Sequence, residues 1–198
     1  MVIKLLSNIL VSRLASAPDV HAVYIDTLGT YNPSLFQSLL PTSSDPAVLD
    51  RIHLMTALNM VTLVEACEQI KQSLSQMVPI ELLVIDTISS PVSLVMNKGQ
   101  LHGHALMQSF THLLRVMTAQ YSLTTLLINA AVKTDLNTLS AFSGTRLKPA
   151  LGATWTFSPD TCILMHRAVE DKVVAEVIRS RSGESGWTAL DISRSKPP

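Results

Sequence analysis

The sequence has few cysteines, no net charge and no long apolar run. Its 198 residues include two cysteines, Cys67 and Cys162, both in apolar stretches. Two such thiols cannot build a disulfide framework or a cysteine metal site, so we expect buried free thiols in a reducing compartment. No stretch approaches the roughly eighteen unbroken apolar residues of a membrane span. Residues 1–14 carry polar side chains at short intervals, unlike a secretory signal peptide.

The charges balance, because fifteen basic side chains face fifteen acidic ones. Any contact with nucleic acid must therefore depend on local groups of basic side chains and not on a global field. Hydrophobic residues make up 47% of the chain, and the mean hydropathy is +0.31. These high values predict burial on both faces of a sheet or a large partner interface. The length suits one α/β domain with a sizeable core.

The most informative stretch is Glu81–Ser90. Four consecutive large apolar residues, Leu82–Ile85, are followed by Asp86 and a turn rich in Thr and Ser. A continuous apolar run is typical of a strand buried on both faces, as in a parallel sheet covered by helices. In such sheets ligands bind outside the carboxyl ends of the strands, where Asp86 falls. Asp86 is either the Mg²⁺-organising carboxylate of a Walker B strand or a core aspartate that caps its turn.

The remaining pattern predicts alternating helices and strands, followed by a region of short strands only. Helical spacings cover 2–17, 34–40, 59–77 and 102–120. Strands are predicted at 22–26, 52–55 and 123–129, and with the central strand they make a mostly parallel sheet. Antiparallel strands are predicted at 154–157, 161–166, 172–179 and 187–192. No repeat or linker occurs, so we expect one domain over residues 1–198 with a tail at 193–198.

Residues 133–148 are polar and rich in Gly, Ser and Thr, which predicts a mobile surface loop. Lys133, Arg146 and Lys148 bracket this loop, and such an arrangement suits contacts with phosphate groups. A merely solvated loop fits the charges equally well.

Two other groups of residues have simpler interpretations. His102 and His104 have no third metal ligand at a useful spacing, so we expect solvated histidines at a helix start and no metal site. Trp155 and Trp187 fall in strand patterns, which places them in a core or an interface.

Several segments together resemble the eukaryotic and archaeal RecA/RadA recombinases. Tyr24–Thr30 is similar to their YIDTEGT strand and turn, Leu82–Ser90 to their Walker B segment, and Leu126–Val132 to their VVITNQV strand. Residues 133–148 fall where the second DNA-binding loop of that family lies. The most specific block, Gly144–Thr161, looks like the GRLKPALG…W-x-F-x-P-x-T stretch of the D-type paralogue of the eukaryotic recombinase.

The resemblance covers nearly all of residues 1–192 and implies a RecA-like P-loop NTPase core. Comparison with the family's motifs also shows where the chain departs from them. No Gly-x-x-x-x-Gly-Lys-Thr occurs in the 198 residues, so the Walker A strand and loop, with their phosphate-binding Lys, are not found. The helix at 1–17 resembles the one that follows this motif. Either the sheet closes without that strand or a longer chain supplies it.

Two further residues of the hydrolytic apparatus are replaced. The resemblance places the catalytic Glu at Leu28, whose side chain cannot accept a proton or orient a water. It places the Gln that senses the terminal phosphate at Ala130. Asp86 alone remains, as a vestigial Walker B residue associated with nucleotide and Mg²⁺.

These departures imply a non-catalytic recombinase-paralogue subunit that supports homologous recombination and DNA repair in the nucleus. It would stack against other paralogue subunits and contact single-stranded or branched DNA without sequence preference, away from membranes. On this account the chain alone is not an enzyme and binds no cofactor. One alternative is a DNA-dependent ATPase that binds ATP and Mg²⁺ through a P-loop in a longer chain. Another is a structural RecA-like module without DNA contact.

Overall fold

The computed structural model describes residues 12–17, 19–38, 46–96, 100–135, 139–142, 145–167 and 172–191. The chain divides into two compact units, Met1–Asn129 and Ala130–Pro198, and each is described by itself. The expectation of a single RecA-like domain stays a prediction. Residues 12–16 are helical, whereas the rest of the helix predicted at 2–17 and the tail at 193–198 lie outside the described residues.

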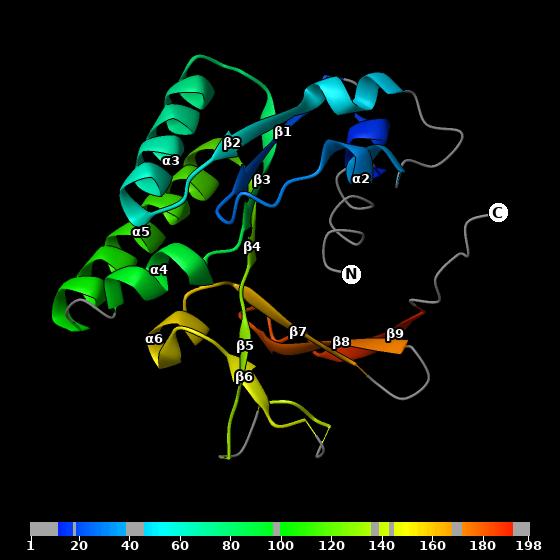
Figure 1. Cartoon of the computed structure of the whole chain (residues 1–198). Helices are drawn as coiled ribbons and strands as arrows, with labels where there is room; N and C mark the ends of the chain where they lie inside the picture. Colours follow the sequence, from blue (N-terminus) through cyan, green and yellow to red (C-terminus); the bar gives the residue numbers. More distant parts are fainter. Residues whose placement is uncertain are drawn as a thin grey trace. The chain divides into compact units, whose positions relative to one another are not determined.

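A parallel sheet forms the centre of the first unit (Figure 1). Its strand order is β2 (Ile52–Thr56), β1 (His21–Asp26), β3 (Ile80–Asp86) and β4 (Thr124–Ile128). Because β3 pairs in parallel with both β1 and β4, it lies inside the sheet, and Leu82–Ile85 are all buried. The predictions of a mostly parallel sheet and of a doubly buried central strand are confirmed.

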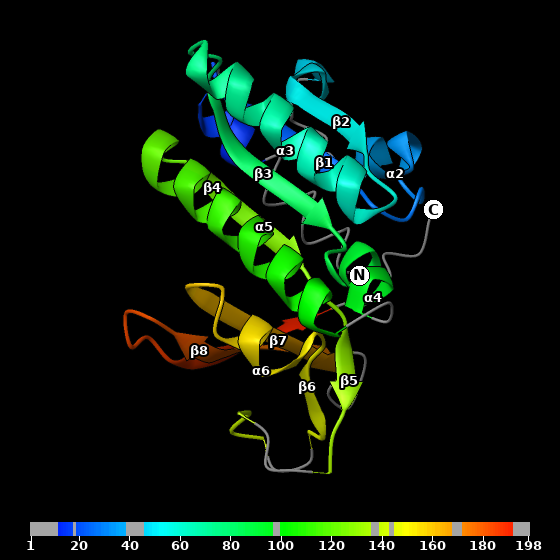
Figure 2. The ribbon, with the colours of Figure 1, turned by 90° about the vertical axis from the view of Figure 1, so that its left-hand side faces the viewer.

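Different elements cover the two faces of this sheet. Helices α3 (Met60–Ser75), α4 (Ser89–Met96) and α5 (Gln100–Tyr121) contact one another, and α3 and α5 lie across the near face in Figure 2. On the other face a cluster of side chains buries Leu14, Val48 and the strand residues Tyr24 and Val84. Helix α2 (Pro33–Ser38) lies on that side in Figure 1, and the 3₁₀ helix η1 (Pro46–Arg51) precedes β2.

Helix α4 is absent from the sequence prediction, which gave a turn rich in Thr and Ser up to its first residues and no element after it. Its eight residues are too few for a clear helical period, and Pro91 resembles a helix breaker. Proline is tolerated in the first turn of a helix, where its missing N–H has no intrahelical partner. The longer helices were easier to predict. Asn59 caps the amino end of α3, and its side chain accepts from the backbone N–H groups of Val61 and Thr62 at 2.9 and 3.0 Å.

The second unit is built from antiparallel pairs, as expected for the carboxyl-terminal region. Strands β5 (Ala131–Lys133) and β6 (Leu147–Pro149) form a short ribbon, here called the β5–β6 ribbon. Strands β7 (Thr161–Arg167), β8 (Lys172–Ser180) and β9 (Gly186–Asp191) form a separate sheet in that order. The ribbon corrects the sequence prediction, which placed all of residues 133–148 in a loop.

The strand predicted at 154–157 is wrong, because helix α6 (Gly152–Thr156) occupies that place. Threonines on either side of Trp155 imitate the alternation of a strand, yet the Phe157 N–H donates to the Ala153 carbonyl at 3.3 Å, as in a helix. Trp155 is buried as expected. Trp187 is 62% exposed, so it does not lie in the core of the described structure.

Two stacked histidines at the amino ends of β1 and β2 predict a pH-dependent stability. The His21 Nδ1 and His53 Nε2 atoms lie 2.8 Å apart. Burial, and then the charges of His53 and Arg51, lower the pKa of His21 below its ordinary value of 6.5. Folding therefore favours the neutral ring, and this contribution to stability is present above pH 6.5 and lost as the pH falls through the folded pKa.

We expect the urea midpoint to be lower at about pH 5.5 than at about pH 7.5. The decrease should be smaller in His21→Gln, which has no titrating ring at this position. Comparing the two proteins removes the contributions of other titrating groups. An equal decrease in both would contradict the prediction.

Candidate functional site

The carboxyl ends of β1 and β3 bring two aspartates to the same edge of the sheet. Asp26 and Asp86 are paired in the register of these neighbouring parallel strands. Thr27 follows the first and Thr87 the second, and the Thr27 N–H donates to the Asp86 carbonyl at 2.8 Å. The peptide bond between Asp86 and Thr87 is cis. This edge is where ligands bind in open parallel sheets.

Asp26 stabilises its own turn. One carboxylate oxygen accepts from the backbone N–H groups of Leu28 and Gly29, both at 2.9 Å, and the other accepts from Tyr31 N–H at 2.7 Å. Gly29 has φ +70°, a conformation that glycine adopts without steric cost. Because both oxygens are engaged and the side chain is buried, Asp26 serves as a structural cap.

Asp86 is half-buried and interacts with the neighbouring strand. The Tyr24 hydroxyl donates to Asp86 Oδ2 at 2.6 Å. Burial raises the pKa of Asp86; the hydrogen bond from Tyr24 lowers it, and the charge of Asp26 raises it. Burial and the nearby carboxylates raise the pKa of Tyr24, so its hydroxyl remains protonated and able to donate.

The side chains around Asp86 are oxygen-bearing. The Thr87 and Ser89 hydroxyls lie 3.0 Å apart, and the Thr27 hydroxyl donates to the Thr87 carbonyl at 2.7 Å. A carboxylate and hydroxyls are ligand types that suit hydrated Mg²⁺ beside a nucleotide. Within the described residues, no group of three or more His, Cys, Asp or Glu side chains is placed to hold a metal ion.

The two residues that the resemblance assigns to the family's catalytic Glu and sensor Gln each follow a strand. Leu28 lies in the turn after β1, with its side chain 50% exposed. Ala130 precedes β5, and its carbonyl accepts from the Ala150 N–H at 2.9 Å. Neither side chain has a polar atom, so neither can take a proton or bind a phosphate oxygen.

In the second unit, Lys133 and Arg146 contribute to one basic hollow. Its volume is about 440 Å³. It lies at the end of the β5–β6 ribbon and beside the end of β7, and its lining is Lys133, Thr134, Asp135, Thr145, Arg146, Leu147, His166 and Arg167. Three cations thus face one carboxylate, and none of the ion pairs between described residues uses these cations. Such a hollow can bind an anion.

Lys148, the third predicted loop cation, does not line this hollow. In the β5–β6 ribbon it pairs with Val132, whereas Lys133 pairs with Leu147. Neighbouring residues on a strand point to opposite faces, so Lys148 lies on the other face of the ribbon from Leu147.

Sequence reasoning missed Arg167 and His166. Both belong to β7, which follows the loop only after helix α6. No spacing in the sequence connects them to Lys133 or Arg146. The available signal was a strand that ends on a cation.

Part of the predicted mobile loop is anchored on the antiparallel sheet. The Ser140 hydroxyl and the Ala141 N–H donate to the two oxygens of Glu176, each at 2.6 Å, and Glu176 is buried on β8. The Phe142 ring then packs edge-on against His166 and Trp187, with centroids 5.3 and 5.4 Å away. These contacts hold residues 140–142 of the loop against the antiparallel sheet.

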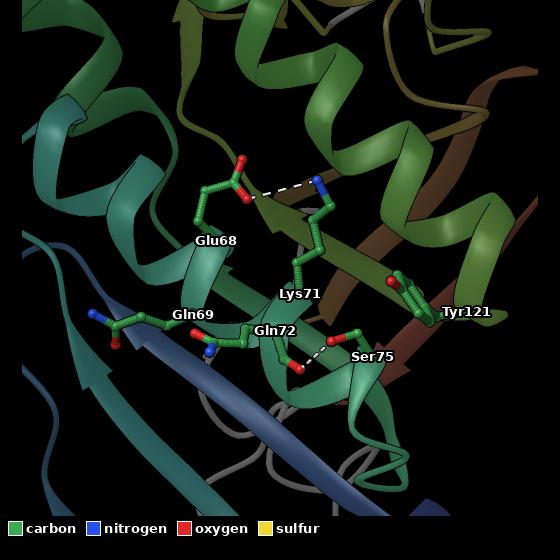
Figure 3. Close-up of a pocket in the computed structure, with 6 residues that line it drawn as sticks. All are labelled: Glu68, Gln69, Lys71, Gln72, Ser75 and Tyr121. Carbon is green, nitrogen blue, oxygen red and sulfur yellow. Dashed lines mark hydrogen bonds and ion pairs between the residues drawn. The ribbon is translucent and has the colours of Figure 1, made fainter.

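A further hollow of about 440 Å³ lies between helices of the first unit (Figure 3). It is lined by Glu68, Gln69, Lys71, Gln72, Ser75 and Tyr121. Its polar groups largely satisfy one another: Lys71 pairs with Glu68 at 3.6 Å, and the Ser75 hydroxyl donates to the Gln72 carbonyl. It lies near the carboxyl end of α3, which leads into the amino end of β3, so it is remote from Asp86. None of the helices in the described part of the chain is long and apolar enough to cross a membrane.

Comparison with known proteins gives consistent matches. The Rad51 family model matches residues 10–193. The chain is 28% identical over 170 residues to "DNA repair protein rdl1" of Schizosaccharomyces pombe. The aligned residues cover 85% of this chain and 67% of that protein. It is 26% identical over 164 residues to "DNA repair protein RAD51 homolog 4" of Bos taurus, covering 78% of this chain and 48% of that protein.

The mouse protein of the same name is 21% identical over 164 residues, with the same two coverages of 78% and 48%. The chain therefore spans about half the length of the two mammalian relatives. The resemblance to a RecA-type recombinase paralogue is confirmed by these matches. Since the family model covers most of its residues, the chain belongs to the Rad51 family.

Proposed function

We propose that this chain is a non-catalytic Rad51-family subunit that supports homologous recombination and DNA repair. The names of its relatives describe DNA repair proteins. The observation that carries the non-catalytic part is Leu28, which occupies the position that the resemblance assigns to the catalytic Glu. Its half-exposed apolar side chain lies in the turn that Asp26 holds in place.

Two other residues support the same proposal. Hydrolysis of ATP requires a group that activates water and groups that stabilise the phosphates. Ala130 has no side chain able to sense a phosphate, and Asp86 already accepts a hydrogen bond from Tyr24. What remains of the family's site is a carboxylate that fits a structural or nucleotide-associated role better than a catalytic one.

Contact with DNA would use the basic hollow. Lys133 and Arg146 line it, as two of the three loop cations that the sequence indicated. Phosphate contacts of this kind give affinity without reading the sequence of the bases. Work on chromosomal DNA would place the protein in the nucleus.

Association with other Rad51-family subunits would use the exposed apolar side chains near the carboxyl edge of the sheet. Leu58 and Val61 are exposed, as is Leu28. The Ala57 N–H donates to the Asp26 carbonyl at 3.0 Å, so the turn that holds Leu58 lies beside the turn that holds Leu28, and Val61 follows in the first turn of α3. Exposed apolar side chains gathered in one region favour a protein partner.

We expect negligible ATP turnover by the purified chain. The loss of one well-placed catalytic group costs about 10²–10⁴ in rate, and here two such groups are replaced. The measurement is release of inorganic phosphate with and without DNA. Asp86→Asn is the matched control, because it keeps an acceptor for Tyr24 while removing the charge. Hydrolysis that is present in the wild-type chain and disappears in Asp86→Asn would refute the proposal, since a contaminating ATPase would not respond.

One observation favours a second candidate, a DNA-dependent ATPase that binds ATP and Mg²⁺ through a P-loop in a longer chain. Asp86 retains its place at the carboxyl end of β3, beside the Thr87 and Ser89 hydroxyls. An in-frame Gly-x-x-x-x-Gly-Lys-Ser/Thr motif upstream of Met1 would support it. A DNA titration of the chain tests the third candidate, a structural module without DNA contact.

A further inference from the structure

Strand β9 forms an edge of the antiparallel sheet in the second unit. It spans six residues, Gly186–Asp191, and pairs with β8 along its whole length without a bulge. No strand among the described residues pairs with its other side, and residues 186–189 are all exposed. The backbone N–H and C=O groups that point to that side form a row to which a further strand can add.

The two edges of this sheet differ in how they are protected against such pairing. Edge strands are commonly protected by lysine, proline, bulges or other charges. The opposite edge strand, β7, has an irregular register between Cys162 and Ile163 and ends on Arg167. Strand β9 has a regular register, no Lys, Arg or Pro, and a single charge at its last residue, Asp191. The composition of β9 therefore favours the addition of a strand.

The exposed tryptophan of β9 supports the same conclusion. Trp187 is 62% exposed, although it belongs to a regular strand. The Phe142 ring contacts the indole edge-on, with the ring planes at 80°, and the same ring contacts His166 on β7. Phe142 therefore reaches Trp187 from the side of β7 and β8, and the opposite side of the indole faces the open edge. Leaving a large indole in water is unfavourable, and tryptophan is enriched among the residues that dominate protein interfaces.

The side chains of β9 are complementary to those of a second copy of the same strand. Trp187 and Ala189 share one face of the sheet, and Gly186, Thr188 and Leu190 share the other. In an antiparallel pair with a two-fold axis perpendicular to the sheet, facing residues lie on the same face, so the axis passes through a residue. With the axis at Thr188, Trp187 faces Ala189 of the second copy, and Gly186 faces Leu190. Each large side chain then meets a small one, and no like charges face each other.

We propose that two copies of this chain associate by antiparallel pairing of their β9 strands, with the two-fold axis at Thr188. Two three-stranded sheets then become one continuous sheet, and the indoles pack over the alanines on one face. The same surface serves both copies, as in any isologous dimer. Backbone hydrogen bonds hold the strands together, and the contacts between large and small side chains fix the register. This surface differs from the apolar side chains of the first unit that are proposed to contact other Rad51-family subunits.

The association is tested by sedimentation velocity of the full 198-residue chain over a range of concentrations. A single strand edge buries little surface, so we expect a micromolar dissociation constant and a transition from monomer to dimer without larger species. Trp187→Ala should raise the dissociation constant by roughly 30-fold or more, the effect of removing a dominant interface residue. Phe157→Ala is the matched control, because Phe157 is a similarly exposed aromatic residue of the second unit outside β9. Its dissociation constant should equal that of the wild type.

The position of the axis is tested by placing charges at Thr188. In the proposed pair this residue faces its own copy, so Thr188→Lys or Thr188→Glu alone places like charges opposite each other and should abolish the dimer. An equimolar mixture of the two variants should restore it, because opposite charges then face each other. Thr161→Lys is the matched control, since it adds the same charge to an exposed threonine on β7 of the same sheet and should leave the dimer unchanged. A mixture that stays monomeric would overturn the proposed register.

Intrinsic fluorescence gives a readout that needs no variant. The chain has two tryptophans, and Trp155 is buried whereas Trp187 is exposed. Pairing of the β9 strands covers the exposed indole, so the emission maximum should move to shorter wavelength as the concentration rises through the dimer transition. Trp187→Phe keeps only the buried indole and should show no such shift. A wild-type dimer whose emission equals that of the monomer would overturn the pairing, whether or not the variants fold.

The outcomes separate this inference from the proposed function. If the chain forms a dimer and the variants at Trp187 and Thr188 behave like their controls, the inference is wrong, and the association uses another surface, such as the apolar side chains around Leu28 and Leu58. The inference is equally wrong if the wild-type chain sediments as a monomer at every concentration, even if β9 then pairs with a strand of a different protein. Neither result changes the proposed contact with DNA.

Discussion

Leu83→Ala is expected to lower the free energy of unfolding by about 2–5 kcal/mol. Leu83 is completely buried in the middle of β3, which has a partner strand on each side and helices over the sheet. The substitution removes apolar contacts and leaves a cavity that the strands cannot close without losing their pairing. Domains are typically stable by about 5–15 kcal/mol, so the loss is a large fraction of the total.

Urea unfolding followed by far-ultraviolet circular dichroism measures this effect, because both tryptophans lie in the second unit and would not report on β3. The control is Leu54→Ala on the edge strand β2, where the side chain is 46% exposed. We expect this control to cost less than about 1 kcal/mol. Equal losses in the two variants would contradict the interior position of β3.

The parallel sheet was predictable because its two interior strands, β1 and β3, are buried on both faces. The apolar run Leu82–Ile85 has no alternation, and such runs are rare outside doubly covered sheets. The helices α3 and α5 are long enough for their apolar spacing to repeat over several turns, so their period is unambiguous.

Several short elements were not predictable from their own residues. Helices α4 and α6 and the strands of the β5–β6 ribbon span eight residues or fewer, so neither period repeats. Their conformation depends on contacts made at a distance. The ribbon forms because Ala131 pairs with Pro149 across the whole loop, and nothing local to either residue indicates that pairing.

The residues of the candidate site likewise include some that the sequence could place and some that it could not. Asp86 and Leu28 could be placed from the sequence, because each follows a strand that the sequence identifies. The basic hollow could not, since His166 and Arg167 of β7 are distant in sequence from Lys133 and Arg146 and come together with them only in the fold. Glu176 is the clearest case: a charged residue inside an apolar strand looks solvated, yet it is buried and binds Ser140 and Ala141.

Replacing Lys133, Arg146 and Lys148 together by alanine is expected to weaken DNA binding uniformly across sequences. Each lost phosphate contact on a single strand should reduce the salt slope by about 0.7, so the triple variant should lose about 1.4 if only the two residues that line the hollow contact phosphate, and about 2 if all three do. The effect does not depend on base sequence, because phosphates carry no sequence information. Titrations of two oligonucleotides of unrelated sequence, each at several salt concentrations, measure both quantities.

The structure divides this loss between the three residues. Lys133 and Arg146 line the basic hollow, whereas Lys148 shares the opposite ribbon face with Val132. If phosphates bind in the hollow, the Lys133→Ala/Arg146→Ala variant should account for most of the change, and Lys148→Ala alone should change little. Alanine keeps the backbone pairing of the ribbon, so circular dichroism spectra and elution volumes should match the wild type. A slope that does not move while the fold is kept would show that these cations are solvated charges, and a variant that fails to assemble with partner subunits would show that they hold an interface instead.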